Sequence, residues 1–341
     1  MPRIYFGVEI EIYVSPKKRL LDLIGDEWKQ TPKANSGKRG RKVKDRLQLI
    51  REGLVSALGA KGFDIELDTG TYEKWAIVEE SLNLIENYWG IELVSNVMHT
   101  SEDLDHDLSL LFRRLDEFVY LYTTESCGTH VHVSVDNQPS PGTSQASFTL
   151  DQLRSILRTI ALCEKPIIEK LPESRKFNKY AQPNISGGSA DKTLQELYNN
   201  VPNDGWDPVF KYINRQRPIK RVVEAAGNSQ VKFTSWNFSP ILNGTKRTVE
   251  FRSPPGVISS RDAKHWVAFA VVFISGAISR QQPGWQPDNG SREYPDSDSL
   301  RQLLSFGVHN LPSSNFWIKA LELYDVGDWM SWQEVVPVLR P

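Results

Sequence analysis

The sequence is poor in the features that mark several large classes of protein. It has two cysteines in 341 residues, Cys127 and Cys163, which argues against a disulfide scaffold and favours a reducing compartment. Its 41 basic and 42 acidic residues nearly cancel, so no overall field draws the chain to nucleic acid or to an anionic membrane. The longest apolar run, residues 266–278, is too short to span a bilayer and predicts a buried helix. The N-terminus has no signal-peptide pattern. We therefore expect a cytoplasmic protein that binds neither nucleic acid nor membrane.

Three short segments carry most of the residues that suit chemistry. They are Gly-Val-Glu-Ile-Glu at 7–11, Gly-Thr-His-Val-His-Val-Ser at 128–134 and Arg-Thr-Val-Glu-Phe-Arg at 247–252. Each alternates polar residues with β-branched or aromatic ones, which predicts a strand. Side chains two apart on a strand share a face. Each strand would therefore present a polar stripe: Glu9 with Glu11, His130 with His132, and Thr248 with Glu250 and Arg252.

These stripes indicate a bound cation. Carboxylates that face a protein core are costly unless something cationic lies among them. Several carboxylates, a histidine and an arginine together indicate divalent cations that hold a phosphate-bearing ligand.

The rest of the chain divides into helical, extended and irregular segments. Residues 33–46 form a basic loop, because Lys and Arg dominate it and Gly, Asn and Ser lie among them. Residues 174–208 are polar and are expected to be irregular and flexible, over a site. The Asn243-Gly244 pair predicts a hairpin between the flanking strands. The remaining expected elements are a first strand at 1–14, helices at 45–58, 104–122 and 150–171, and strands at 75–82 and 91–97.

Four motifs in order resemble those of the amidoligase family, within the glutamine synthetase and glutamate–cysteine ligase group of carboxylate–amine ligases. Each motif alone is weak, whereas four in the right order and spacing are specific. In this chain Glu80 stands where the family usually has aspartate, and Asn96 stands where a proline is common. The motifs are Glu-x-Glu at 9–11, Trp75 with Glu80-Ser81 and Gly-Ile-Glu-Leu-Val-Ser at 90–95, Gly-Thr-His-Val-His-Val-Ser at 128–134, and Glu-x-Arg at 250–252.

The resemblance implies an α+β fold. Its core would be a curved antiparallel sheet of the glutamine-synthetase-like catalytic type, with helices packed on the outer face. The inner face would form a channel that holds ATP and two or more Mg²⁺ ions, for which Mn²⁺ can substitute. We expect a single catalytic domain over residues 1–285, with a basic insertion at about 15–70. A C-terminal helical extension over 286–341 would pack on it.

The resemblance also assigns roles to individual residues. Arg252 would meet the transferred phosphate. Arg175, in an Arg…Asn-x-Tyr segment, would hold a carboxylate or the γ-phosphate, or would belong to a solvated loop. The nucleotide side of the site would include His132, Ser134, Lys246 and Arg247. The metal ligands would be Glu9, Glu11, Glu80, Glu92, His130 and Glu250.

The function implied is an ATP- and Mg²⁺-dependent ligase that joins a carboxylate to an amine. A free carboxylate is a poor electrophile, so the γ-phosphoryl group of ATP would first convert it to an acyl phosphate. The substrates would be a small-molecule or peptide carboxylate and an amine, which the sequence does not identify. Three alternatives remain open. They are a guanidino-kinase-like phosphotransferase on a related sheet, a zinc-dependent hydrolase that uses His130 and His132, and a non-catalytic descendant that binds a nucleotide or peptide.

Overall fold

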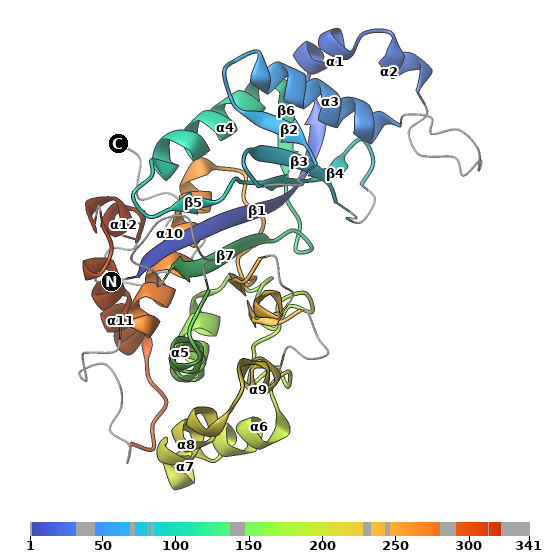
Figure 1. The fold of residues 1–341 in the computed structure, drawn as a ribbon. Coiled ribbons are helices and arrows are strands. Elements are labelled where there is room, and N and C mark those ends of the chain that lie inside the picture. The colour runs from blue at the N-terminus through green and yellow to red at the C-terminus, as the bar shows by residue number, and fades with distance from the viewer. Residues whose placement is uncertain are drawn as a thin grey trace.

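The chain forms one large mixed sheet with helices around it (Figure 1). The computed structural model describes residues 2–31, 45–68, 72–80, 82, 85–136, 147–227, 233–242, 246–279, 291–312 and 314–321. In these ranges the sheet has nine strands, of which seven follow the order β2-β3-β4-β1-β7-β9-β8, while β5 and β6 pair with β1. The strands are β1 (Arg3–Pro16), β2 (Ile65–Leu67), β3 (Trp75–Glu79), β4 (Trp89–Val94), β5 (Met98–His99), β6 (Val119–Tyr122), β7 (Thr129–Asp136), β8 (Trp236–Asn237) and β9 (Val249–Phe251).

The long strand β1 lies at the centre of this sheet. Its residues alternate, so that Ile4, Phe6 and Val8 point into the core while Glu9 and Glu11 point to the other face. It pairs antiparallel with β4, β5, β6 and β7, and the pairing of β2 with β3 is parallel. The expected α+β fold with an antiparallel sheet is therefore confirmed in outline.

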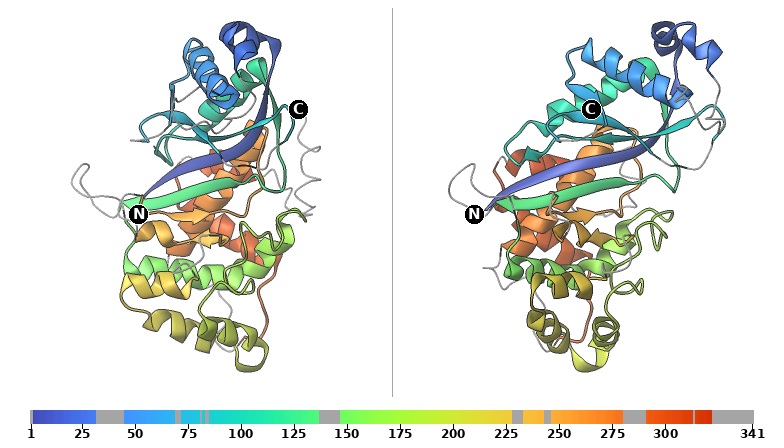
Figure 2. Two further views of the ribbon diagram at one scale, coloured as in Figure 1. Left: turned by 90° about the vertical axis from the view of Figure 1, so that its right-hand side faces the viewer. Right: turned by 45° about the vertical axis from the view of Figure 1, so that its right-hand side comes forward.

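Helices cover the apolar face of the sheet. Helix α10 (Ser260–Ile278) packs on β1 and β7, and α3 (Arg46–Gly59) packs on β2, β3 and β4. In Figure 2 the strands β1 and β7 run side by side with α10 behind them. Helix α10 contains the apolar run at 266–278, whose residues are almost all buried, so the predicted buried helix is confirmed. In the described part of the chain, no helix is both long and apolar enough to cross a bilayer.

A helical lobe lies between β7 and β8 in the sequence, at the bottom of Figure 1. Helix α5 (Leu150–Lys170) begins with a capping box between Thr149 and Gln152, and α8 (Asp207–Arg215) and α9 (Ile219–Ala225) pack on it. The stretch 174–208 is more regular than its polarity predicts, because α6 (Lys192–Asn199) and α7 (Val201–Asp204) lie within it. Asp191 caps α6, which buries Leu194 and Tyr198.

The remaining predictions agree with the structure in part. Helix α3 confirms the helix expected at 45–58, whereas residues 32–44, most of the basic loop, lie outside the described residues. Strands β8 and β9 pair antiparallel as the hairpin prediction requires, but each is only two or three residues long. A 3-10 turn (Ser239–Ile241) follows β8, and residues 243–245 are not described. Of the expected C-terminal extension, α11 (Ser297–His309) and α12 (Ser314–Leu321) pack on α10. The other helices are α1 (Lys18–Ile24), α2 (Glu27–Gln30) and α4 (Leu104–Phe118).

Candidate metal centre

The strand register places the polar stripes side by side on one face of the sheet. Antiparallel partners lie directly opposite each other, so their side chains are neighbours. The order β4-β1-β7-β9 therefore builds one continuous polar face from segments that are far apart in the sequence, such as those of Glu9 and Glu250. The register pairs on this face are Glu11 with Glu92, Glu9 with His130, and His132 with Glu250.

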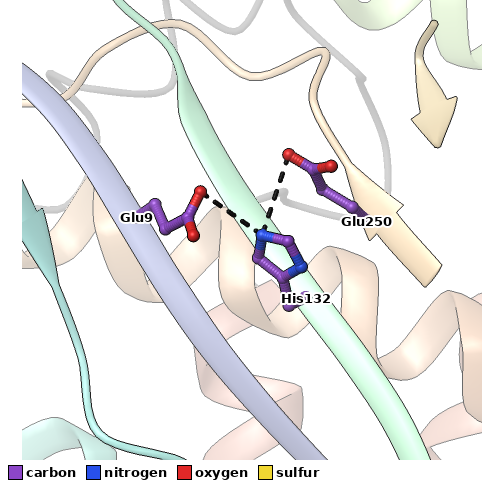
Figure 3. Close-up of side chains that lie close together, drawn as sticks. All are labelled: Glu9, His132 and Glu250. Atoms are coloured by element: carbon purple, nitrogen blue, oxygen red, sulfur yellow. Dashed lines mark ion pairs between the residues drawn. The ribbon is translucent and has the colours of Figure 1, made fainter. Parts of the chain in front are cut away.

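At one end of this face, Glu9, His132 and Glu250 converge from β1, β7 and β9 (Figure 3). His132 Nε2 lies 3.3 Å from Glu9 Oε2 and 3.7 Å from Glu250 Oε1. This nitrogen is buried and has no hydrogen-bond partner among the described residues. The other ring nitrogen, Nδ1, lies 2.9 Å from Thr248 Oγ1, which fixes the ring orientation. A buried nitrogen that makes no hydrogen bond and lies close to two carboxylates fits a bound cation.

Two further groups of potential metal ligands lie beside this one, and we call the three groups together the row. In each, one ligand atom per residue lies within 4.8 Å of the others. The second group is Glu9, Glu92 and His130, and the third is Glu11, Glu80 and Glu92. Because Glu9 and Glu92 are each shared, the three groups form one line across the sheet. The structure thus brings together all the residues that the resemblance assigned to metal, and it adds His132 to them.

The donor atoms are mostly oxygens. Each of the three groups contains two or three carboxylates and at most one imidazole. Carboxylate oxygens with an occasional imidazole suit Mg²⁺ or Mn²⁺, whereas a zinc site is typically richer in histidine and cysteine. The residues present therefore fit hard divalent cations.

Gly128 makes room for this arrangement just before β7. Its N–H donates to Glu11 Oε2 at 2.7 Å, which orients that carboxylate. A Cβ atom at this position would lie 2.7 Å from Nε2 of His130, too close for the ring to keep its place. The glycine of the Gly-x-His-x-His motif is thus explained by the close approach of the first histidine.

The pKa values of the carboxylates differ between the two ends of the row. Burial raises the pKa of Glu9, but His132, His130 and Lys246 outweigh it, so the pKa of Glu9 lies well below its usual value. At the other end, burial and the like charges of Glu9, Glu11 and Glu80 raise the pKa of Glu92 to about 9. In the metal-free protein, an ionised Glu92 would therefore be repelled by the neighbouring carboxylates without a fully compensating positive charge.

This repulsion predicts a pH-dependent stability that one substitution removes. Between the ordinary pKa of a glutamate and about 9, the folded state binds one proton more at Glu92 than the unfolded state. The free energy of unfolding without metal must then fall as pH rises, by at most about 1.4 kcal/mol per pH unit for this group. We expect Glu92→Gln to flatten that decline between pH 5 and 9 and to raise the melting temperature at pH 8.

Thermal melts in excess chelator across this pH range measure the effect. Glu196→Gln, which changes an exposed glutamate on α6, is the matched control and should keep the wild-type slope. Parallel pH profiles for Glu92→Gln and the wild type would contradict the account.

Basic and amide side chains flank the carboxylate row. Lys246 Nζ lies 2.9 Å from Glu9 Oε1. Arg252 Nη1 donates to Glu250 Oε1, and Asn237 Nδ2 donates to Glu250 Oε2 at 2.7 Å. Each oxygen of the Glu250 carboxylate therefore accepts one hydrogen bond, which fixes the orientation of the carboxylate. The guanidinium of Arg252 remains at the edge of the row, where a phosphate would be adjacent to the cations.

Two of the residues expected beside a nucleotide, Ser134 and Arg247, lie outside the three groups of potential metal ligands. Ser134 is buried on β7, two residues beyond His132 and on the same face of the strand. Arg247 has a left-handed backbone with φ of 49°, and its N–H donates to Pro240 O at 3.1 Å. Their contact with a nucleotide remains a prediction.

Arg175 is buried, and main-chain carbonyls occupy most of its donors. Its guanidinium donates to Ser253 O at 2.9 Å, Arg252 O at 2.8 Å, Glu125 O at 3.2 Å and Cys127 O at 3.3 Å. These carbonyls belong to the segment before β7 and the segment after β9. Arg175 therefore joins the two segments that carry His130 and Arg252, and we assign it as a positioning residue.

Removing this guanidinium is expected to destabilise the fold. Arg175→Leu would leave Ser253 O and Arg252 O without their donor, at a cost of about 3 kcal/mol. Cys127 O and Glu125 O would keep bonds from Gly256 N–H and Asn178 Nδ2. Urea denaturation measures this change. Arg221→Leu, on an exposed face of α9, is the control and should cost little. An Arg175→Leu protein as stable as the wild type, but inactive, would instead favour a direct contact with substrate.

A cavity of about 350 Å³ opens beside the row. Part of its lining consists of the carboxylates and His130, and the rest includes residues that no motif marked. Leu82, Ser126 and Phe233 are single residues from separate loops, so no local pattern in the sequence identifies them. The lining residues are Glu9, Glu11, Glu80, Leu82, Glu92, Ser126, His130, Arg175, Tyr180, Phe233 and Arg252.

The fold and site together define a class of protein. It is an α+β protein in which one face of a mostly antiparallel sheet carries a row of carboxylates and imidazoles, with basic side chains at the edge. Residues 2–274 match the family model described as "Putative amidoligase enzyme", so the chain belongs to that family, as its motifs predicted, and is a ligase-type enzyme. No functionally curated protein matches the chain.

Proposed function

We propose that this protein is an ATP- and Mg²⁺-dependent carboxylate–amine ligase that works on a sheet of the glutamine-synthetase-like type. The observation that carries the proposal is the line of three oxygen-rich groups on one face of the sheet, with Arg252 beside it. Membership of the amidoligase family supports an amide bond as the product. A row of cation sites is what the transfer of a highly charged phosphoryl group needs.

The residues fall into roles along the row. Glu9, Glu250 and His132 hold a cation at the end nearest Lys246 and Arg252, where basic groups favour the nucleotide phosphates. Glu11, Glu80 and Glu92 hold a cation at the cavity end, where the acceptor carboxylate enters. Cations held by these residues would supply neutralisation of the phosphate charges. The protein's own side chains fix where those charges lie.

The reaction then has two steps. A carboxylate oxygen of the acceptor attacks the γ-phosphorus, and the bond to the bridging oxygen breaks, which releases ADP. The amine attacks the acyl carbon, loses a proton and displaces inorganic phosphate. Arg252 is oriented by Glu250 and is suited to the oxygens of the phosphoryl group in flight, because a guanidinium forms two parallel hydrogen bonds.

A zinc hydrolase has less support. His130 and His132 fall into different groups, so neither group offers the histidine pair that such a mechanism requires.

Phosphate release from ATP, screened against carboxylates and amines with mass spectrometry of the products, tests the proposal. We expect turnover only when a carboxylate is present, with Mg²⁺ or Mn²⁺, and an amide as product. Full activity of metal-stripped protein with stoichiometric zinc and no magnesium would contradict it. A stable phosphorylated guanidine as product would favour the kinase alternative.

A further inference from the structure

The walls of the cavity divide by chemistry. The residues on the sheet side are the candidate metal ligands. The rest of the lining, which we call the second wall, contains the apolar or aromatic Leu82, Tyr180 and Phe233, together with Ser126, Arg175 and Arg252. A substrate whose carboxylate lies at the cation row must place the rest of its body against this second wall.

The aromatic part of the wall is held rigidly. The rings of Tyr180 and Phe233 meet edge to face, with centroids 6.0 Å apart. Their backbones are joined two residues further on, where Gln182 N–H donates to Phe233 O at 2.9 Å and Ser235 N–H donates to Gln182 O at 2.7 Å. The two rings therefore form a preformed surface whose position does not depend on a ligand.

Most charged side chains among the described residues that line the cavity already have partners, although Arg252 Nε makes no hydrogen bond. Among the described residues that line it, every acid belongs to a cation group. Arg252 pairs with Glu250, and Arg175 donates to main-chain carbonyls. The hydroxyl of Ser126 lies 2.8 Å from Thr124 Oγ1. An ammonium or second carboxylate next to Leu82, Tyr180 and Phe233 would lose hydration against apolar and aromatic side chains, which is costly.

We infer that the activated substrate is a monocarboxylate with an uncharged, apolar or aromatic body, which Tyr180 and Phe233 select. This inference rests on the proposed function, because it takes the reacting carboxylate to lie at the cation row. It goes further in excluding dicarboxylates and α-amino dicarboxylates as the preferred substrates. Apolar walls with a few placed polar groups are the usual means by which a pocket fixes a ligand's body.

The experiment traps the acyl phosphate with hydroxylamine. The nitrogen of hydroxylamine attacks the acyl carbon and phosphate leaves, which gives a hydroxamate that is detected as its coloured complex with added Fe³⁺. The probes are 3-phenylpropanoate and glutarate, which differ in whether the far end is a phenyl ring or a second carboxylate. We expect kcat/KM for 3-phenylpropanoate to exceed that for glutarate by about tenfold or more, the scale of one well-buried apolar contact.

Substitutions test whether Phe233 and Tyr180 contact the body of the substrate. Phe233→Ala and Tyr180→Ala should each lower kcat/KM for 3-phenylpropanoate by about tenfold, mainly through KM, and leave glutarate nearly unchanged. Phe177→Ala is the matched control, because that ring is on the same loop as Tyr180 but is 63% exposed and does not line the cavity. Calorimetry of 3-phenylpropanoate binding, with Mg²⁺ and a non-hydrolysable ATP analogue, provides a readout that needs no turnover.

The outcomes separate the two claims. Hydroxamate formed equally or better from glutarate would overturn the inference and leave the ligase standing. No hydroxamate from either acid, with 3-phenylpropanoate binding that Phe233→Ala abolishes, would overturn the ligase and retain the apolar site. Absence of both hydroxamate and binding would overturn both.

Discussion

Glu9→Gln is expected to lower ATP turnover by about three orders of magnitude while the protein stays folded. Glu9 belongs to two of the three candidate cation groups, so its loss weakens both the nucleotide end and the centre of the row. Loss of a single oriented electrostatic group commonly costs about a hundred- to a thousandfold, and here two sites are affected. Among the carboxylates of the described residues, only Glu92 shares this position in two groups.

The stability cost of Glu9→Gln should be modest. Because His132 and Lys246 stabilise the ionised carboxylate, its charge contributes to the stability of the metal-free fold. Glutamine keeps a hydrogen-bond acceptor for Lys246, and we expect a loss of about 1 kcal/mol. Steady-state ATP turnover at saturating Mg²⁺, with a chelator melt of the same variant, gives both numbers. A Glu9→Gln protein that is unfolded without metal, or one that retains a tenth of wild-type turnover, would contradict the assignment.

Arg252→Lys is expected to lower turnover by about two to three orders of magnitude with little change in ATP affinity. The guanidinium lies beside Glu250. In the proposed reaction, charge would develop next to it on the phosphoryl group in flight. Lysine keeps the charge but cannot make two parallel hydrogen bonds. The interaction is then lost mainly in the transition state, which lowers kcat more than binding.

Two measurements on the same variant separate these effects. Calorimetry gives ATP affinity, and single-turnover ADP formation gives the chemical rate. Arg221→Lys, which changes an exposed arginine on α9, is the control and should match the wild type in both. Equal losses in affinity and rate would make Arg252 a ground-state binding residue. No loss in either would make it a structural partner of Glu250.

The sequence predicted the faces of the central strands well, because alternation is a local property. The spacing of Glu9 and Glu11, and of His130 and His132, is enough to place each pair on one side of its strand. Which strands become neighbours in the sheet depends on contacts between distant segments of the chain. The registers of β1 with β4 and β7, and of β7 with β9, come from the structure.

Other parts of the site had no signal in the sequence. Phe233 and Leu82 line the cavity as single residues from loops, and Arg175 is defined by the carbonyls it meets. Backbone acceptors carry no sequence signature, so the role of Arg175 could not be separated from a surface loop or a phosphate contact. Helices α6 and α7 were missed because their polar composition hides short amphipathic turns that become stable only by packing within the lobe.

The fate of the carboxylate oxygen tests the central claim most directly. If the substrate carboxylate attacks the γ-phosphorus, one of its oxygens leaves with phosphate when the amide forms. A carboxylate labelled with oxygen-18 should therefore give inorganic phosphate that carries one labelled oxygen, together with unlabelled ADP. Label in AMP would show adenylation and a different class of ligase, and unlabelled phosphate formed alongside the amide would exclude an acyl phosphate and contradict the account.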